Sequence, residues 1–426
     1  MNGKGRKLKK TISLLDATSI GVGAIVGAGI FVVLGVGAGL AGPAVILSLV
    51  IAGVVALLTA LSFVQLSEQI TREGGAYGFA RELISPFGGF LTGFLWIVSN
   101  IVAGATVSLG FAYYASALLP SLPVVPLAVL ACLAATAINY AGVKDSVRVN
   151  NALVGTKLLT LIFFIAAGFL FLNLGRFHPF APMGLGGILS GAALIFFAYG
   201  GFARITTVSE EVEDAGRTVP KAILLALGIS AALYVLVAIA AIGLSDYKDF
   251  SRSGSFLATA ISSTKISYAA LIVSIGALAA TASVLLTTVL GISRVLFAMS
   301  KNGELPDLFS SIASNGVPRN AVLASGLASA LLAMLGDLTL VASISSFAML
   351  AYYASANFSA LRLREARFPK IIPLAGATSC IALLVFLSPR SILIGFAAVL
   401  CGSGYYFYRF LQKKEKVRQC KPAREN

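Results

Sequence analysis

The sequence predicts an all-α integral membrane protein with about twelve transmembrane helices, and three observations support this fold class. The chain has 426 residues, of which 58% are hydrophobic and only 12% are charged, roughly half the charged share of a typical soluble protein. Apolar runs of about 20 residues, each long enough to cross the hydrocarbon core of a bilayer, recur along the whole chain. No polar segment between them is long enough to form a separate soluble domain.

Charged and helix-breaking residues separate the apolar runs and set the expected ends of each span. The third and eighth runs are longer than one upright helix needs, so we expect both to be tilted. In chain order the expected spans cover residues 13–40, 43–68, 86–119, 123–141, 149–174, 186–210, 218–244, 266–300, 320–336, 338–361, 371–388 and 391–411.

The net charge of +15 indicates membrane topology rather than a nucleic-acid partner. The basic residues lie between the apolar runs and at both tails, without the aromatic or glycine-rich context typical of RNA-binding segments. With an even number of spans both tails lie on one side, and that side carries 26 of the 32 Lys and Arg residues against five on the other. The positive-inside rule therefore predicts a multi-pass protein of the cytoplasmic (plasma) membrane, with both termini cytoplasmic.

The sequence offers few groups for chemistry other than transport. His178 is the only histidine, and the four cysteines do not pair at a metal-like spacing, so we expect neither a metal site nor a His-based catalytic triad. No Asp, Glu or His lies deep in an expected span, which leaves a membrane-embedded enzyme without a nucleophile–base pair. We therefore expect no cofactor and no enzymatic activity.

Two expected spans contain glycine-rich interruptions. The first span includes Gly21 to Phe31, with four glycines in nine residues, which is poor for helix continuity. The sixth includes Phe196 to Phe202, which contains Gly200 and Gly201. Interruptions at matching positions in two sets of five spans point to a transporter binding site, although small residues also serve close helix packing alone.

A helix break in the middle of a membrane has a chemical consequence. The freed backbone groups cost several kcal/mol each in hydrocarbon, so they must line a cavity or be buried by protein. The half-helix after the break directs its positive N-terminal end, with free N–H groups, at the gap, which suits a carboxylate. Because Gly27, Ala28 and Gly29 carry little side-chain bulk, a ligand can reach this backbone.

Lys157 is the one charged residue deep within an expected span. It lies about eight residues inside the fifth span, roughly 12 Å along the helix axis. Charged groups at such depth are costly and usually face a cavity where they serve function, and a buried lysine is suited to releasing and taking up a proton. The alternatives are a side chain that snorkels to the interface or hydrogen-bonds a free carbonyl.

Several motifs, ordered and correctly spaced, resemble the amino acid–polyamine–organocation (APC) superfamily of transporters. The run from Gly21 to Phe31 resembles the helix 1 signature, and Gly74 to Tyr77 the first cytoplasmic loop. The remaining matches are Phe196 to Phe202, Glu210-Glu211 and Val219 to Ile223 around helix 6, and Ser293 to Pro306 at the end of helix 8. By this resemblance the chain is identified as a transporter of the amino acid permease type.

The resemblance implies a leucine-transporter-type fold of two inverted five-helix repeats, in which helices 1 and 6 are broken. Helices 11 and 12 are added after the repeats, and the sequence does not indicate an oligomeric state. The implied organisation is a basic cytoplasmic tail at 1–12, a first repeat at 13–174, a second repeat at 186–365, the last two helices at 371–411 and a basic cytoplasmic tail at 412–426.

The resemblance also implies a substrate site at the two breaks. Backbone N–H groups of helix 1 would bind the α-carboxylate of an amino acid, and backbone carbonyls of helices 1 and 6 would bind its α-amino group. The implied N–H groups are near Ala28, Gly29 and Ile30, and the implied carbonyls are near Ile25, Phe196 and Ala198.

Three side chains complete the implied substrate site. Phe197 matches an aromatic that closes over the substrate in relatives, Asn100 matches a polar position that faces the site, and Tyr199 is grouped with them. Each has an alternative role: Asn100 as a hydrogen bond between helices, and the two aromatics as plain core.

The resemblance assigns Lys157 a role in coupling. Many sodium-independent members place a lysine here, in the space of a sodium ion. Lys157 would then neighbour the Gly23 backbone, with Ser283 of helix 8 near the same space. We expect these three residues to form a proton-coupling group, in which protonated Lys157 bonds to the helix 1 break and releases it when neutral.

The expected function is secondary active transport of an amino acid together with a proton. Members selective for cationic substrates often carry an acid just after the Gly-Phe of helix 6, where this chain has Ala203. A small or apolar neutral amino acid therefore fits better. The alternatives are an uncoupled exchanger of amino acids or amines, and a non-transporting amino acid sensor of the same fold.

Two features near the cytoplasmic ends have open interpretations. Arg204, just past the helix 6 break, is ambiguous, and we expect it to face the cytoplasmic vestibule. Glu210 and Glu211 form either a solvated helix end or one side of a cytoplasmic gate with a loop arginine such as Arg72 or Arg81.

Overall fold

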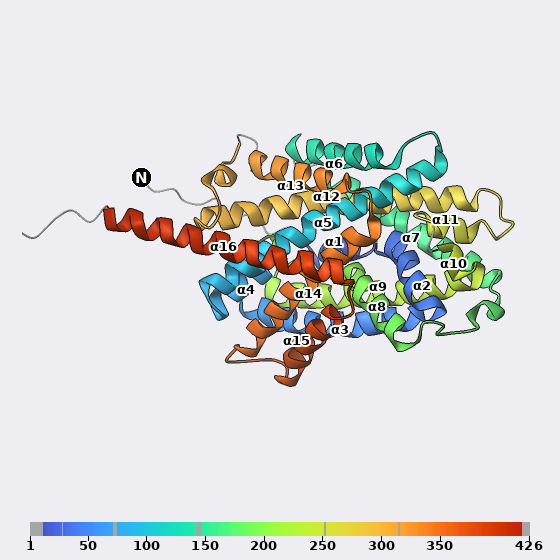
Figure 1. Ribbon diagram of the computed structural model, residues 1–426, viewed down its shortest axis with the longest axis horizontal. Coiled ribbons are helices and arrows are strands. Elements are labelled where there is room, and N and C mark those ends of the chain that lie inside the picture. The colour runs from blue at the N-terminus through green and yellow to red at the C-terminus, as the bar shows by residue number, and fades with distance from the viewer. Residues whose placement is uncertain are drawn as a thin grey trace, which may run out of the picture.

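The computed structural model describes residues 12–27, 29–70, 75–141, 146–250, 253–313 and 316–419, so the predicted basic tails lie largely outside it. Across these ranges the secondary structure is helical, without a strand. A parallel β-bridge joins Ile12 to Val212. Most long helices run close to the long axis of the molecule, and α16 extends past its neighbours at one end (Figure 1).

The helices follow one another with short connections. In order they are α1 (Leu14–Ile25), the π-helix η1 (Gly29–Val33), α2 (Leu34–Ala41), the 3₁₀ helix η2 (Gly42–Ala44), α3 (Val45–Gln69), α4 (Ala76–Leu83), α5 (Pro86–Leu118), α6 (Val124–Ala141), α7 (Ser146–Leu170), the 3₁₀ helix η3 (Leu174–Phe177), α8 (Gly184–Ile195), the 3₁₀ helix η4 (Phe196–Glu211), α9 (Ala215–Leu244), α10 (Tyr247–Phe250), α11 (Phe256–Ile261), α12 (Ala269–Lys301), the 3₁₀ helix η5 (Asp307–Ser310), α13 (Arg319–Ala333), α14 (Leu338–Leu361), α15 (Ile371–Leu384) and α16 (Pro389–Gln419).

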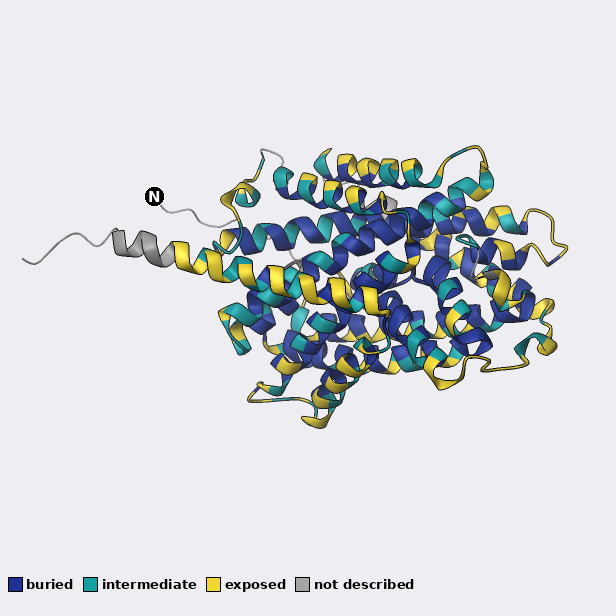
Figure 2. Ribbon diagram, viewed as in Figure 1, coloured by how far each residue is buried: buried dark blue, intermediate teal, exposed yellow. Residues whose placement is uncertain are grey.

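The prediction of an all-α membrane protein is confirmed. In the part of the chain that the structure describes, nine helical runs are long and apolar enough to cross a membrane, and α13 and α15 are shorter apolar helices. Exposed leucine and phenylalanine side chains cover the outer helices, while buried residues gather at the centre (Figure 2). An apolar outer surface suits contact with lipid, where no water is present to solvate polar groups.

Local sequence signals explain where several helices begin. Ser13 caps α1 through its hydroxyl, and Asp16 bonds back to the Ser13 backbone, which forms a capping box. Ser85 caps α5, with Pro86 in the first turn where no donor is needed. Gly42 adopts a left-handed φ of 64°, which turns the chain between α2 and α3 at a position where other residues are strained.

Helix 1 is interrupted where its glycines predict a break. α1 ends at Ile25, and Val26 is extended, with ψ of 94°. The helical backbone resumes at Gly29 as a π-helix and continues into α2. A wide turn of this kind inside a helix is uncommon and frequently marks a functional site.

The sixth expected span, residues 186–210, does not open into a loop at Phe196 to Phe202 as the broken-helix prediction implied. The α-helix α8 ends at Ile195, and the chain continues as the sixteen-residue 3₁₀ helix η4. The backbone tightens here and keeps its hydrogen bonds, while the carbonyls point in other directions than in an α-helix. Runs of 3₁₀ helix longer than four residues are uncommon, so η4 is a special segment although it is not an open loop.

Two predicted loops contain further helices. α4 lies between the second and third expected spans, and α10 and α11 lie between the seventh and eighth. α4 lies at one end of the helix bundle, and α10 and α11 lie at the other (Figure 1). These helices are too short for the periodicity of an apolar span to show them.

Candidate functional site

The two interrupted segments meet backbone to backbone. A Cβ atom added to Gly29 would overlap Ala198, and one added to Gly201 would overlap the backbone of Ala24 and Ile25. Glycine permits such close approach because it has no side chain. The glycines that weaken both helices therefore also allow α1 and η4 to contact each other.

Tyr234 of α9 joins the two breaks through its side chain. Its Oη lies 2.6 Å from the Ile25 carbonyl oxygen and 3.0 Å from that of Ala198. These are two of the three carbonyls expected to bind a substrate amino group, and one donor reaches both. Tyr234 was not among the residues expected at the site. A tyrosine within an apolar span is nevertheless a signal, because a buried phenol needs a hydrogen-bond partner.

A small cavity of about 30 Å³ lies at the same place, with room for a water molecule or two. An amino acid therefore requires the cavity to widen. The cavity is lined by Ala24, Ile25, Gly27, Gly29, Asn100, Ala103, Val107, Phe197, Ala198, Gly200, Gly201, Arg204, Val284 and Met349. Five of the residues expected at the substrate site are among them.

The other expected substrate residues lie at different places. The side chains of Ile30 and Phe196 are fully buried beside Gly29 and Phe197, and only their backbone groups were expected to act. Tyr199 turns away from the cavity, with its hydroxyl donating to the Leu49 carbonyl at 3.0 Å, so core packing describes it better. Ala28 lies outside the described residues.

Arg204 reaches the cavity wall and is not confined to a cytoplasmic vestibule. Its Nη1 donates to Thr287 Oγ1 at 2.8 Å, and its Nη2 donates to Thr288 Oγ1 at 2.7 Å. The same Nη2 lies 3.2 Å from Asn100 Oδ1, and the Asn100 amide donates to the Trp96 carbonyl at 2.8 Å. Asn100 therefore lines the cavity and also bonds a residue of another helix segment.

Lys157 of α7 turns inward, which excludes snorkelling. Its Nζ donates to the Gly23 carbonyl at 2.6 Å and to Ser283 Oγ at 3.1 Å, and the residue is fully buried. The structure brings together the three residues expected to form the coupling group. Gly23 lies two residues before the end of α1 at Ile25, so Lys157 contacts the last turn of this helix.

The sequence profile described as "Amino acid permease" matches residues 16–418. The chain belongs to the amino acid permease family. This confirms the resemblance to the APC superfamily and agrees with a multi-pass membrane transporter.

Several curated relatives of this permease span most of its length. An uncharacterised transporter of Mycobacterium tuberculosis is 35% identical over 412 residues, covering 95% of this chain and 92% of the relative. The branched-chain amino acid permease BcaP of Bacillus subtilis is 29% identical, and the match covers 97% of this chain and 96% of BcaP. Cationic amino acid transporter 4 of Mus musculus is 32% identical, and the match covers 85% of this chain and 61% of that transporter.

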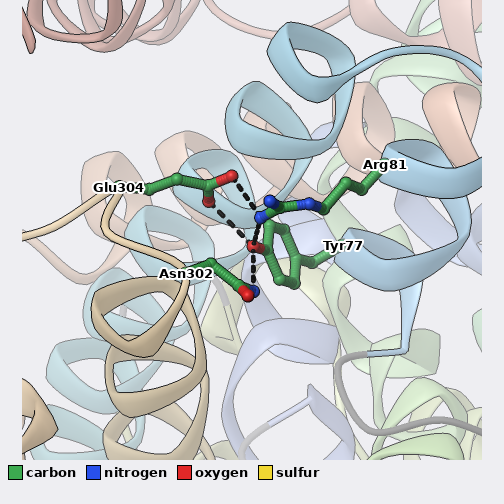
Figure 3. Close-up of polar contacts among 4 residues, drawn as sticks. All are labelled: Tyr77, Arg81, Asn302 and Glu304. Atoms are coloured by element: carbon green, nitrogen blue, oxygen red, sulfur yellow. Dashed lines mark hydrogen bonds and ion pairs between the residues drawn. The ribbon is translucent and has the colours of Figure 1, made fainter. Parts of the chain in front are cut away.

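A polar cluster of Tyr77, Arg81, Asn302 and Glu304 joins α4 of the permease to the segment after α12 (Figure 3). Arg81 pairs with Glu304 at 2.5 Å and donates to Tyr77 Oη at 2.6 Å. Tyr77 donates to Glu304 at 2.8 Å and accepts from Asn302 at 2.8 Å. Burial and the negative Glu304 raise the pKa of Tyr77 to about 12.

This cluster brings together two family-like motifs that are far apart in the sequence, those ending at Tyr77 and at Pro306. It gives Arg81 a partner, Glu304, that the expected gate did not include. The side chains of Glu210 and Glu211, and all of Arg72, lie outside the described residues.

Proposed function

We propose that this permease is a secondary active transporter of small or apolar neutral amino acids, which bind in the cavity between α1 and η4. The observation that carries the proposal is the convergence of the Ile25 and Ala198 carbonyls within 3.0 Å of one hydroxyl. Two carbonyl oxygens so close together suit an ammonium group, which has three donors. The first N–H groups of the helix that resumes at Gly29 suit the carboxylate.

The proposed substrate is neutral because of what lines the cavity. Glycine, alanine, valine, phenylalanine and methionine make up most of the wall, and none of its described residues is acidic. A cationic side chain would have no carboxylate there to offset its desolvation. The name of BcaP, a branched-chain amino acid permease, agrees with an apolar neutral substrate.

We propose twelve transmembrane helices arranged as two inverted repeats of five, with two added helices and both termini in the cytoplasm. The first apolar run covers Leu14–Gln69, and the left-handed Gly42 divides it into two spans. Adding α13 and α15 to the resulting ten gives twelve. The basic residues on the side of the tails support a cytoplasmic location in the plasma membrane.

We propose that Lys157 couples transport to a proton. When charged, its ammonium group holds the Gly23 carbonyl and so the end of α1. When neutral, it retains fewer donors, and α1 is freer to move relative to α7 and α12. The alternative function within the same family is that of an uncoupled exchanger. In such an exchanger Lys157 stays charged and only occupies the place of the sodium ion.

Transport by the purified permease in liposomes tests this proposal. We expect uptake of labelled L-valine or L-alanine to rise as the external pH falls, because inward proton movement drives accumulation. Lys157→Ala should abolish this pH response while leaving some counterflow exchange, and the exposed Lys265→Ala serves as the control.

Three outcomes would reject parts of the proposal. Full pH-driven accumulation by Lys157→Ala would reject proton coupling through this lysine. Counterflow without any pH response in the unmodified permease would favour the exchanger. Binding of the amino acid without uptake would favour a sensor.

A further inference from the structure

A groove of about 520 Å³ lies on the outside of the helix bundle between α5 and α14, with α16 along one side. It shares no described lining residue with the cavity between α1 and η4. Phe358 of α14 lines this groove and is 43% exposed, so the groove opens outward, where the bundle contacts lipid. The groove is therefore a surface feature that the proposed transport function does not use.

The walls of the groove suit a hydrocarbon chain. Apart from Thr92, Ser355 and one arginine, its described lining residues are apolar or glycine. Thr92 donates to the Gly88 carbonyl at 2.7 Å, and the Thr92 and Ser355 hydroxyl oxygens lie 2.6 Å apart, so both hydroxyl groups are satisfied within the wall. From Ala351 to the end of α14 the groove follows this helix for roughly 15 Å, which is the depth of one leaflet of the hydrocarbon core.

The arginine lies at one end of the groove. Arg362 follows Leu361, the last residue of α14, and is exposed. Its Nη1 donates to the Leu83 carbonyl of α4 at 3.4 Å, and among the described residues Leu83 is its one hydrogen-bond partner. A guanidinium has five N–H donors, and its planar fork matches the oxygens of a phosphate. The groove therefore combines an apolar wall with a positive group, rich in donors, at its mouth.

The loop after α14 makes this end of the groove positive. Residues 362–370 include four basic residues and one acid, Glu365, which gives a net charge of +3. Arg367 is paired with Glu68, while Arg364 is exposed. Basic segments beside a membrane attract anionic lipids, and basic pockets between transmembrane helices bind anionic headgroups. The charge and the apolar wall together favour an anionic amphiphile over a neutral one.

We propose that this groove binds an anionic phospholipid, with one acyl chain between α5 and α14 and the phosphate at the guanidinium of Arg362. The apolar wall gives the acyl chain a surface to pack against, which a soluble phosphate does not use. The bound lipid contacts both helices at once, so it stabilises the folded permease. This site goes beyond the proposed transport function and does not depend on which substrate the cavity holds.

Native mass spectrometry of the purified full-length permease in detergent tests this site. The probes are dioleoyl phosphatidylglycerol, which has a net negative charge, and dioleoyl phosphatidylcholine, which has the same acyl chains and no net charge. We expect phosphatidylglycerol to bind about tenfold more tightly, because a hydrogen bond to an ionised partner is stronger than one between neutral groups and no choline group offsets its phosphate. Inorganic phosphate should not bind at the same concentrations, since it lacks the acyl chains.

Two variants and a matched control locate the lipid on the protein. Arg362→Gln should lower the affinity for phosphatidylglycerol by about tenfold, to near that for phosphatidylcholine. Ala351→Phe places a ring in the half-buried wall of the groove and should weaken the binding of both lipids. The control is Arg364→Gln, because Arg364 is an exposed arginine of the same loop and is not among the described lining residues. It should keep the preference for phosphatidylglycerol.

Each other outcome overturns the proposal. Equal affinities of the unmodified permease for the two lipids would reject an anionic lipid site. An unchanged preference in Arg362→Gln, or an equal loss in Arg362→Gln and Arg364→Gln, would show that the basic loop attracts anionic lipids without the groove. Binding of inorganic phosphate as tight as that of phosphatidylglycerol would identify a site for soluble anions. None of these results changes the proposal for amino acid transport, because the groove and the cavity share no described lining residue.

Discussion

At the scale of single residues, Tyr234 and Lys157 hold the same short stretch of helix 1 from two sides. Tyr234 donates to the carbonyl of Ile25, and Lys157 donates to that of Gly23. Both carbonyls belong to the end of α1, where intrahelical donors are missing. The side chains therefore compensate for the break, and either one can change the position of this segment.

Tyr234→Phe should lower the stability of the substrate-free permease by roughly 1–2 kcal/mol, because the mutation removes the donor shared by two buried carbonyls. An amino acid with its ammonium group in the cavity supplies new donors to the same carbonyls. The substrate-induced rise in the thermal midpoint should therefore be larger in this variant than in the unmodified protein.

Tyr199→Phe is the matched control for this prediction. Its hydroxyl also bonds one buried carbonyl, that of Leu49, but it lies away from the cavity. We expect a loss of stability without a larger substrate effect. Equal substrate effects in both variants would show that Tyr234 holds no group that the substrate uses.

At the scale of elements, α4 is fastened to the end of α12 by the cluster around Tyr77. Glu304 is nearly buried, with a side-chain exposure of 8%, while Arg81 is 36% exposed. A hydrogen-bonded ion pair that is partly shielded contributes more than an exposed pair, and its geometry fixes the position of a short helix that has little stability of its own. The cluster therefore orders one end of the bundle.

The raised pKa of Tyr77 predicts that the stability of the permease depends on pH. Its pKa is about 12 in the folded protein against 10.0 ordinarily, so the unfolded chain loses the phenolic proton first as the pH rises. The contribution of Tyr77 is therefore fully present below pH 10 and declines between about pH 10 and 12. The thermal midpoint of the unmodified permease should fall toward that of Tyr77→Phe over this range.

Comparing the two proteins at each pH removes the effect of other groups that titrate in alkali. A midpoint difference that stays constant from pH 9 to about pH 12 would contradict the raised pKa of Tyr77. A difference near zero at pH 9 would show that the cluster contributes no measurable stability.

At the scale of the whole molecule, apolar periodicity and breakers predicted the long helices well, because a bilayer imposes their length and composition. The break at Ile25 followed from clustered glycines, and the Lys157 contacts from the family resemblance. The sequence did not predict that η4 tightens into a 3₁₀ helix, since its glycines indicate only that an α-helix is weak there. That geometry also decides where Arg204 points.

The sequence also did not predict the contacts between segments that are far apart along the chain. Tyr77 and Glu304 are 227 residues apart, and the polar type of each residue does not identify the other as its partner. The same holds for Tyr234, whose two acceptors lie on different helices. Backbone acceptors leave no trace in residue identity, so only the assembled fold shows them.

We propose that a zwitterionic amino acid binds between the two interrupted helices. An electron cryomicroscopy map of the permease saturated with L-valine tests this most directly. We predict density for the ligand in a widened cavity, with its carboxylate at the N–H groups of Gly29 and Ile30 and its amino group at the carbonyls of Ile25 and Ala198. Ligand density elsewhere in the molecule, with this cavity still closed, would contradict the claim.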